Sequence, residues 1–168
     1  MKITSFRYDL LPLKDKLFRL ALRITLNRPE AEDIVQDTML KAWVKRGQAG
    51  DIDSIEAYCM TICRNLSLDV TRRRERTSIS LDESPHDVED SAPGAEEKLE
   101  QEEKYKKVHD IFSRLPEKQR TIMQLRDIEG KSVRETAEIT GMTEENVKVI
   151  LFRARKAIRE EFGKQAAK

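Results

Sequence analysis

The chain has 168 residues, of which 38% are hydrophobic and 38% charged, with six glycines and five prolines. This length allows one ordinary domain or two small ones, and the composition fits a surface-rich helical protein better than a β-sandwich. The formal net charge of +1 argues neither for nor against a polyanionic partner. Whether the chain can bind one therefore depends on how its charges are distributed. No apolar run approaches the roughly 20 residues that span a bilayer, and no signal-peptide core follows the first residues. We therefore expect an all-α, cytoplasmic protein.

Two cysteines, Cys59 and Cys63, are spaced so that both thiols lie along one side of a helix. Without a histidine nearby, the pair favours two small buried side chains in a reducing compartment over a metal or redox site. Both alternatives stay open from the sequence. We expect no cofactor and no metal.

Residues 77–97 interrupt the helical patterns of the chain. This segment is acidic, contains prolines and has neither a helical nor a strand period. We interpret it as a flexible acidic linker between an N-terminal unit of residues 1–76 and a C-terminal unit of residues 98–168. The prediction is therefore two small helical domains, whose relative arrangement the sequence leaves open.

The helix expected over residues 31–43, which follows an amphipathic helix over 10–24, carries two stripes. One stripe is apolar with helical spacing and is expected to face the core: Ala31, Ile34, Val35, Thr38, Met39, Ala42 and Trp43. The other lies on a different face and is mixed: Asp33, Gln36, Asp37 and Leu40. Such a face suits a protein partner that presents basic groups around an apolar centre. A solvated helix face with one stray leucine is the alternative.

A third helix is expected to begin at Asp53, which can form a capping box with Glu56, and to run into the basic segment 72–76. Cations in a last helical turn are favoured by the helix dipole, which is the simpler interpretation of this cluster. Four arginines exceed that need. Together with Asn65, which can read a base edge, and Tyr58, which can stack, they indicate a nucleic-acid surface. The candidate residues are Tyr58, Thr61, Asn65, Arg72 and Arg73.

The C-terminal unit has the pattern of a helix-turn-helix. Pro116 separates two helices, and Gly130 ends the second of them. A capping box at Ser132 begins a short helix, a turn with Gly141 follows, and a longer helix comes next. The outward side of that last helix is basic and apolar, as in a helix that enters the DNA major groove: Lys148, Val149, Phe152, Arg153 and Lys156. An ordinary α-hairpin with a basic surface, or Phe152 buried against the first unit, are the alternatives.

Residues 31–43, Ala-Glu-Asp-Ile-Val-Gln-Asp-Thr-Met-Leu-Lys-Ala-Trp, closely resemble the polymerase-clamp-binding helix of extracytoplasmic-function sigma factors. Residues 115–120, 128–132 and 147–156 look like the −35-reading domain of the same family. The two matches occur in the right order, and together they cover nearly the whole chain. The resemblance implies a sigma factor that binds bacterial core RNA polymerase and directs promoter-specific transcription initiation, without enzymatic activity.

The resemblance also implies roles for the candidate residues. Asp33, Gln36, Asp37 and Leu40 would dock on the clamp helices of the polymerase's largest subunit, and the loop 46–54 with Asn65 would capture a base flipped from the −10 element. Lys148, Phe152, Arg153 and Lys156 would face the −35 duplex. The family implies an anti-sigma factor, often membrane-bound, so the chain is expected as a monomer when free or as a heterodimer with that partner. Tyr58 and Ile150 depart from the family's common Trp and Arg, which leaves the promoter sequence open.

Two other classes of function compete with this interpretation. A stand-alone repressor or activator would use the helix-turn-helix but would leave the Asp33 to Leu40 face unused, and it would need a dimer interface. An enzyme is a weaker alternative, because neither His86 nor His109 pairs with a nucleophile or carboxylate at a recognised spacing. Both histidines are expected to be exposed to solvent.

Overall fold

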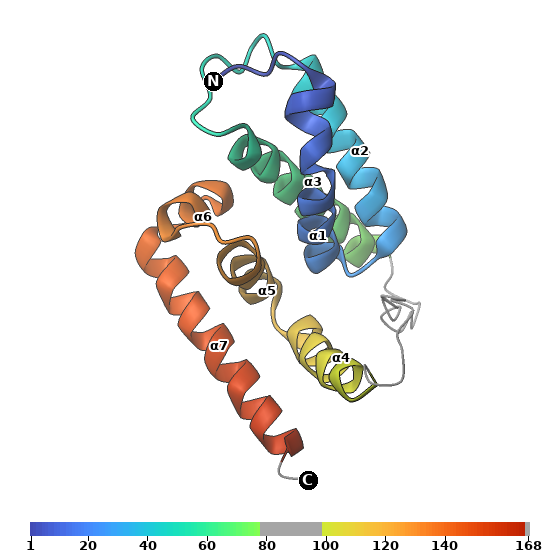
Figure 1. The fold of residues 1–168 in the computed structure, drawn as a ribbon, viewed down its shortest axis with the longest axis vertical. Helices are drawn as coiled ribbons and strands as arrows, with labels where there is room; N and C mark the ends of the chain where they lie inside the picture. Colours follow the sequence, from blue (N-terminus) through green and yellow to red (C-terminus); the bar gives the residue numbers. More distant parts are fainter. Residues whose placement is uncertain (78–98, 167–168) are drawn as a thin grey trace.

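The computed structural model describes residues 1–77 and 99–166 (Figure 1). Helices dominate this part of the chain and no strand occurs in it, so the predicted all-α fold is confirmed. Within the same ranges, no helix is both long and apolar enough to cross a bilayer. The predicted linker, residues 77–97, lies outside the described residues except for Thr77, which ends a helix.

The N-terminal unit packs three helices: α1 (Lys14–Thr25), α2 (Arg28–Val44) and α3 (Ile55–Thr77), after the short turns η1 (Phe6–Leu10) and η2 (Leu11–Leu13). Leu26 adopts a left-handed φ of 54° and ends α1. The Asn27 side chain then accepts a hydrogen bond from the Glu30 backbone N–H at 3.0 Å, which begins α2 one turn before the mixed face.

The start of α3 differs from the sequence-based prediction in its capping residue. The Oγ atom of Ser54 accepts a hydrogen bond from the Ala57 backbone N–H at 3.2 Å, so Ser54 and not Asp53 caps the helix. The side chain of Glu56 is consequently free of a capping role and contacts Lys16 and Lys131 instead. Met60 is fully buried, as are Cys59 and Cys63.

The C-terminal unit contains α4 (Leu99–Arg114), α5 (Glu117–Met123), η4 (Gln124–Ile128), α6 (Val133–Thr140) and α7 (Glu144–Ala166). Ser132 caps α6 by accepting from the Glu135 backbone N–H at 3.0 Å, as predicted. Gly141, with a φ of 70°, ends α6 in the left-handed conformation that glycine adopts without strain. The short helix, tight turn and long helix of a helix-turn-helix are therefore present.

The two units pack directly on each other, α6 against α3 and α5 against α1 (Figure 1). Leu125 and Ile139 of the second unit are 0% and 1% exposed and belong to the apolar core of the first unit. His109, expected to be exposed, is half-buried at this contact, with its Nδ1 atom 3.0 Å from Nη1 of Arg23. That prediction was wrong because the pattern of one helix does not reveal a second unit packed on it. His86 lies outside the described residues.

Candidate nucleic-acid and partner surfaces

The mixed face of α2 is fully presented to solvent. The four predicted residues of this face are all exposed: Asp33, Gln36, Asp37 and Leu40, the last by 59%. The apolar stripe on the other side of the helix is buried and includes Ala31, Ile34, Val35 and Thr38. Val44, one turn beyond Leu40, is 69% exposed and extends the apolar centre of this face. The sequence analysis did not include Val44 in this face, although its spacing of four residues from Leu40 places the two side chains on the same side of a helix. Two exposed aliphatic side chains beside carboxylates favour a docking surface over a solvated face.

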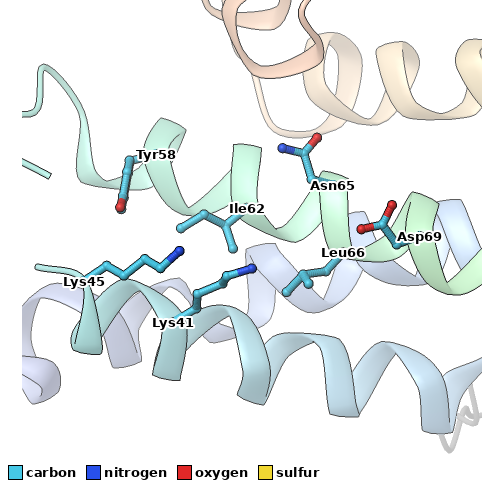
Figure 2. Close-up of a pocket in the computed structure, with 7 residues that line it drawn as sticks. All are labelled: Lys41, Lys45, Tyr58, Ile62, Asn65, Leu66 and Asp69. Atoms are coloured by element: carbon cyan, nitrogen blue, oxygen red, sulfur yellow. The ribbon is translucent and has the colours of Figure 1, made fainter. Parts of the chain in front are cut away.

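A groove runs between α2 and α3 and has a volume of about 240 Å³ (Figure 2). Two of the predicted −10 residues, Tyr58 and Asn65, line it from α3. Lys41 of α2 and Lys45, the residue that follows α2, extend into it from the opposite side, and Ile62, Leu66 and Asp69 complete its lining. The groove thus combines an aromatic ring, an amide, two cations and one carboxylate.

The lysines of this groove were missed from the sequence. Lys41 and Lys45 are one helical turn apart, a spacing that puts both on one side of α2, but only the packing of α3 places them opposite Tyr58. The predicted Thr61 does not line the groove. Its hydroxyl donates to the Ala57 carbonyl at 2.9 Å.

The arginines at the end of α3 have different roles. Arg74 donates to a Glu30 carboxylate oxygen at 3.0 Å and to the Thr25 carbonyl at 2.9 Å, so it ties the end of α3 to α1 and α2. Arg72 and Arg73 are exposed. The predicted pair therefore stands at the surface, whereas Arg74 belongs to the structure of the unit.

The outward face of α7 carries the predicted −35 residues. All five are exposed, Val149 by 45% and Phe152 by 62%, whereas Val147, Leu151 and Ala154 are buried against the rest of the unit. The alternative in which Phe152 is buried against the first unit is wrong. A large aromatic side chain exposed among basic residues has no packing role here, and it fits contact with thymine methyl groups.

Arg155 lies on α7 but is not part of this face. Its guanidinium forms a two-bond ion pair with Asp127, with Nε 3.1 Å from Oδ2. This pairing raises the pKa of Arg155 and ties α7 to the segment that precedes the helix-turn-helix.

The two cysteines, Cys59 and Cys63, are buried inside the first unit. Burial raises the pKa of each thiol to about 12. The Sγ atom of Cys63 lies 3.4 Å from the Leu17 carbonyl. In the described ranges no group of three or more His, Cys, Asp or Glu side chains is placed to hold a metal ion. These features match the interpretation as small buried side chains.

Both units match known sequence families. Residues 12–77 match "Sigma-70 region 2", and residues 105–158 match "Sigma-70, region 4". Region 2 contains the α2 face and the groove, and region 4 contains the helix-turn-helix. The fold and surfaces thus define a two-region transcription protein of the sigma-70 class.

Individual relatives narrow this class. The chain is 30% identical to the ECF RNA polymerase sigma factor EcfG of Rhodopseudomonas palustris over 90% of this chain and 81% of that protein. It is 28% identical to the RNA polymerase sigma factor SigV of Bacillus subtilis over 90% and 87% of the two chains. The chain belongs to the extracytoplasmic-function sigma factors of the sigma-70 family. Its relatives are transcription regulators and not enzymes.

Solved structures agree with this assignment. The sigma factor RpoE of Bartonella quintana, in complex with the anti-sigma factor NepR, matches with a TM-score of 0.77 and 26% identity over 94% of this chain and 96% of that chain. CnrH, in complex with the cytosolic domain of CnrY, shares the fold with a TM-score of 0.64 and 20% identity over 92% and 85% of the two chains. Sigma factors bind core RNA polymerase, and the Bartonella quintana sigma factor was solved with an anti-sigma factor.

Proposed function

We propose that this chain binds core RNA polymerase and directs it to promoters by reading the −10 element with residues 1–76 and the −35 element with residues 98–168. The observation that carries the proposal is the presence of three separate exposed surfaces on one chain: the α2 face, the groove beside Tyr58 and the outward face of α7. A stand-alone repressor would use only the last of these.

The groove suits a single unstacked base of the −10 non-template strand. The Tyr58 ring can stack on the base, the Asn65 amide can both donate to and accept from its edge, and Lys41 with Lys45 can contact the flanking phosphates. A site that binds only the unstacked base shifts the duplex toward opening by its differential affinity. Arg72 and Arg73 continue the basic surface along α3.

The α7 face suits the major groove of the −35 duplex. Arg153 can form a bidentate contact with guanine, Phe152 and Val149 can contact thymine methyl groups, and the lysines can contact phosphates. All of these side chains are exposed.

The α2 face suits the polymerase. Two carboxylates around Leu40 and Val44 provide charge at the rim and apolar area at the centre, which is the usual composition of a protein interface. We also propose an anti-sigma factor as a second partner, because the similar sigma factor RpoE was solved with such a protein.

The proposal is tested by selecting binding sites from a random duplex library with the chain assembled on core polymerase. We expect the recovered DNA to contain two conserved blocks at a fixed spacing. Asn65→Ala is expected to relax only the downstream block, and Arg153→Ala only the upstream block. Recovery of one palindromic block, bound equally well without polymerase, would favour the repressor instead.

A further inference from the structure

An acidic side chain lies on the α7 face that is proposed to read the −35 duplex. Glu145 is exposed. It precedes Lys148 by three residues, Val149 by four and Phe152 by seven. Because residues at these spacings lie on one side of a helix, Glu145 shares the outward side of α7 with them. The −35 residues predicted from the sequence did not include it.

The first turn of α7 is the part of this helix that base edges can meet most directly. In a helix-turn-helix, the N-terminal residues of the second helix contact the bases in the major groove. The Thr143 hydroxyl oxygen caps this turn by accepting a hydrogen bond from the Asn146 backbone N–H at 3.1 Å. The backbone that carries Glu145 is therefore held in helical form before DNA binds.

The Glu145 carboxylate is not engaged by another side chain. Farther along α7, Glu160 lies 4.0 Å from the Lys156 ammonium. Within the ranges that the structure describes, Glu145 has neither an ion pair nor a side-chain hydrogen bond. Its oxygens are therefore available as acceptors on a face that otherwise presents cations and apolar groups.

The helix dipole gives this carboxylate a structural role but does not explain its direction. Glu144 and Glu145 both lie in the first turn of α7, where a negative charge is favourable on any side of the helix. Glu144 lies about 100° around the helix from Glu145 and lines a shallow hollow with Gly141 and Met142. Of these two carboxylates, only Glu145 is directed to the proposed DNA.

An ionised carboxylate accepts hydrogen bonds and donates none, which makes it selective among base edges. In the major groove, guanine presents two acceptors, thymine presents an acceptor and a methyl group, and adenine presents an acceptor beside its amino group. Cytosine alone presents a donor without an acceptor. It is therefore the base that a carboxylate can contact without facing a lone pair.

We propose that Glu145 is a specificity-determining residue, which accepts a hydrogen bond from the N4 amino group of a cytosine in the −35 element and disfavours the other three bases. The inference rests on the proposed function, because it requires α7 to lie in the major groove. Glu145 and Arg153 are about 12 Å apart along the helix, at about 1.5 Å per residue. At about 3.4 Å per base pair, the cytosine should lie about three to four base pairs from the position that Arg153 reads.

The test measures binding of the full chain to duplexes based on the upstream block from the library, with each of the four bases placed at every position in turn. Glu145→Gln replaces the carboxylate with an amide that donates as well as accepts, and glutamine pairs with N6 and N7 of adenine. Glu145→Ala removes both functions. Glu144→Gln is the matched control, because it removes the same charge from the same turn on a different side.

We expect the wild type to prefer cytosine at one position by about five- to twentyfold. E145Q should favour adenine at that position, E145A should show no preference there, and E144Q should retain cytosine. Each variant removes one negative charge, so all three should bind the whole set of duplexes more tightly by a similar factor. Thermal unfolding should be the same for E145Q and E144Q, since both lose the same interaction with the helix dipole.

Unchanged base preferences in both E145Q and E145A would overturn the proposal, and so would the same change of preference in E144Q. Failure of the proposed function has a different signature. If the wild type distinguishes none of the duplexes and Arg153→Ala changes nothing, α7 does not read the −35 element. If Arg153→Ala relaxes its own position while the Glu145 variants change none, only the role of Glu145 fails.

Discussion

Arg74 and Glu30 join the end of α3 to the start of α2, with Nη1 of Arg74 3.0 Å from a carboxylate oxygen of Glu30. The neighbouring Arg73 is exposed. Of these two adjacent arginines, Arg74 therefore stabilises the fold, whereas the exposed Arg73 can contact DNA.

Arg74→Ala should therefore lower the free energy of unfolding by about 1–2 kcal/mol, because it leaves the Thr25 carbonyl and the Glu30 carboxylate without this partner. Arg73→Ala should change stability by less than about 0.5 kcal/mol and should weaken DNA binding. Urea denaturation and binding to single-stranded −10 DNA measure the two effects. Equal loss of stability in both variants would contradict this division of roles.

Asp37→Arg is expected to abolish association with core polymerase and to leave the fold intact, because Asp37 is exposed on the α2 face. Glu32→Arg, with the same charge change on an exposed position about 140° around α2 from Asp37, is the control and should retain binding. Affinity for labelled core polymerase and the thermal unfolding curve together decide the outcome. Normal binding by Asp37→Arg would remove the α2 face from the docking surface.

Tyr58→Ala should weaken binding to single-stranded −10 DNA by about 1–3 kcal/mol, because the groove loses its stacking surface. Tyr8→Ala is the control, since Tyr8 is 75% exposed and lies outside the groove. Fluorescence anisotropy with labelled oligonucleotides provides the measurement. Equal effects of the two substitutions would argue against base capture at Tyr58.

Arg153→Ala should cost about 1–3 kcal/mol in binding to the −35 duplex and should relax sequence preference at one position, if the guanidinium contacts a base. Titrations on several duplex sequences and at several salt concentrations measure this. A uniform loss on all sequences, with a salt slope reduced by about one, would instead identify a phosphate contact.

Cys59 and Cys63 should resist alkylation in the native protein. Since burial raises both pKa values to about 12, less than about one thiol in ten thousand is ionised at pH 7.5. Mass spectrometry after iodoacetamide treatment should find both thiols unmodified, and both modified once the chain is unfolded in guanidinium. Native modification at the rate of a free thiol would mean that this part of the core opens readily.

Much of the fold was predictable because burial follows helical periodicity. The buried stripe from Ala31 to Ala42 and the exposed α7 face from Lys148 to Lys156 were both correct, since each depends on the spacing within one helix. The cap of α6 at Ser132 was equally local.

The remaining features depend on contacts between segments far apart in the chain. The fixed position of Arg74, the burial of Leu125 and Ile139 in the core of the other unit, and the lysines that face Tyr58 are set by tertiary packing. Periodicity within one helix carries no information about its neighbour. The arrangement of the two units was left open for the same reason.

The central claim is tested most directly by sizing-column chromatography of the purified chain mixed with sigma-free core RNA polymerase. We predict a stable complex in which the chain elutes with the polymerase, and loss of that complex in the Asp37→Arg variant. Separate elution of the chain from its cognate core polymerase would contradict the account, and it would leave DNA binding by α7 as the remaining function.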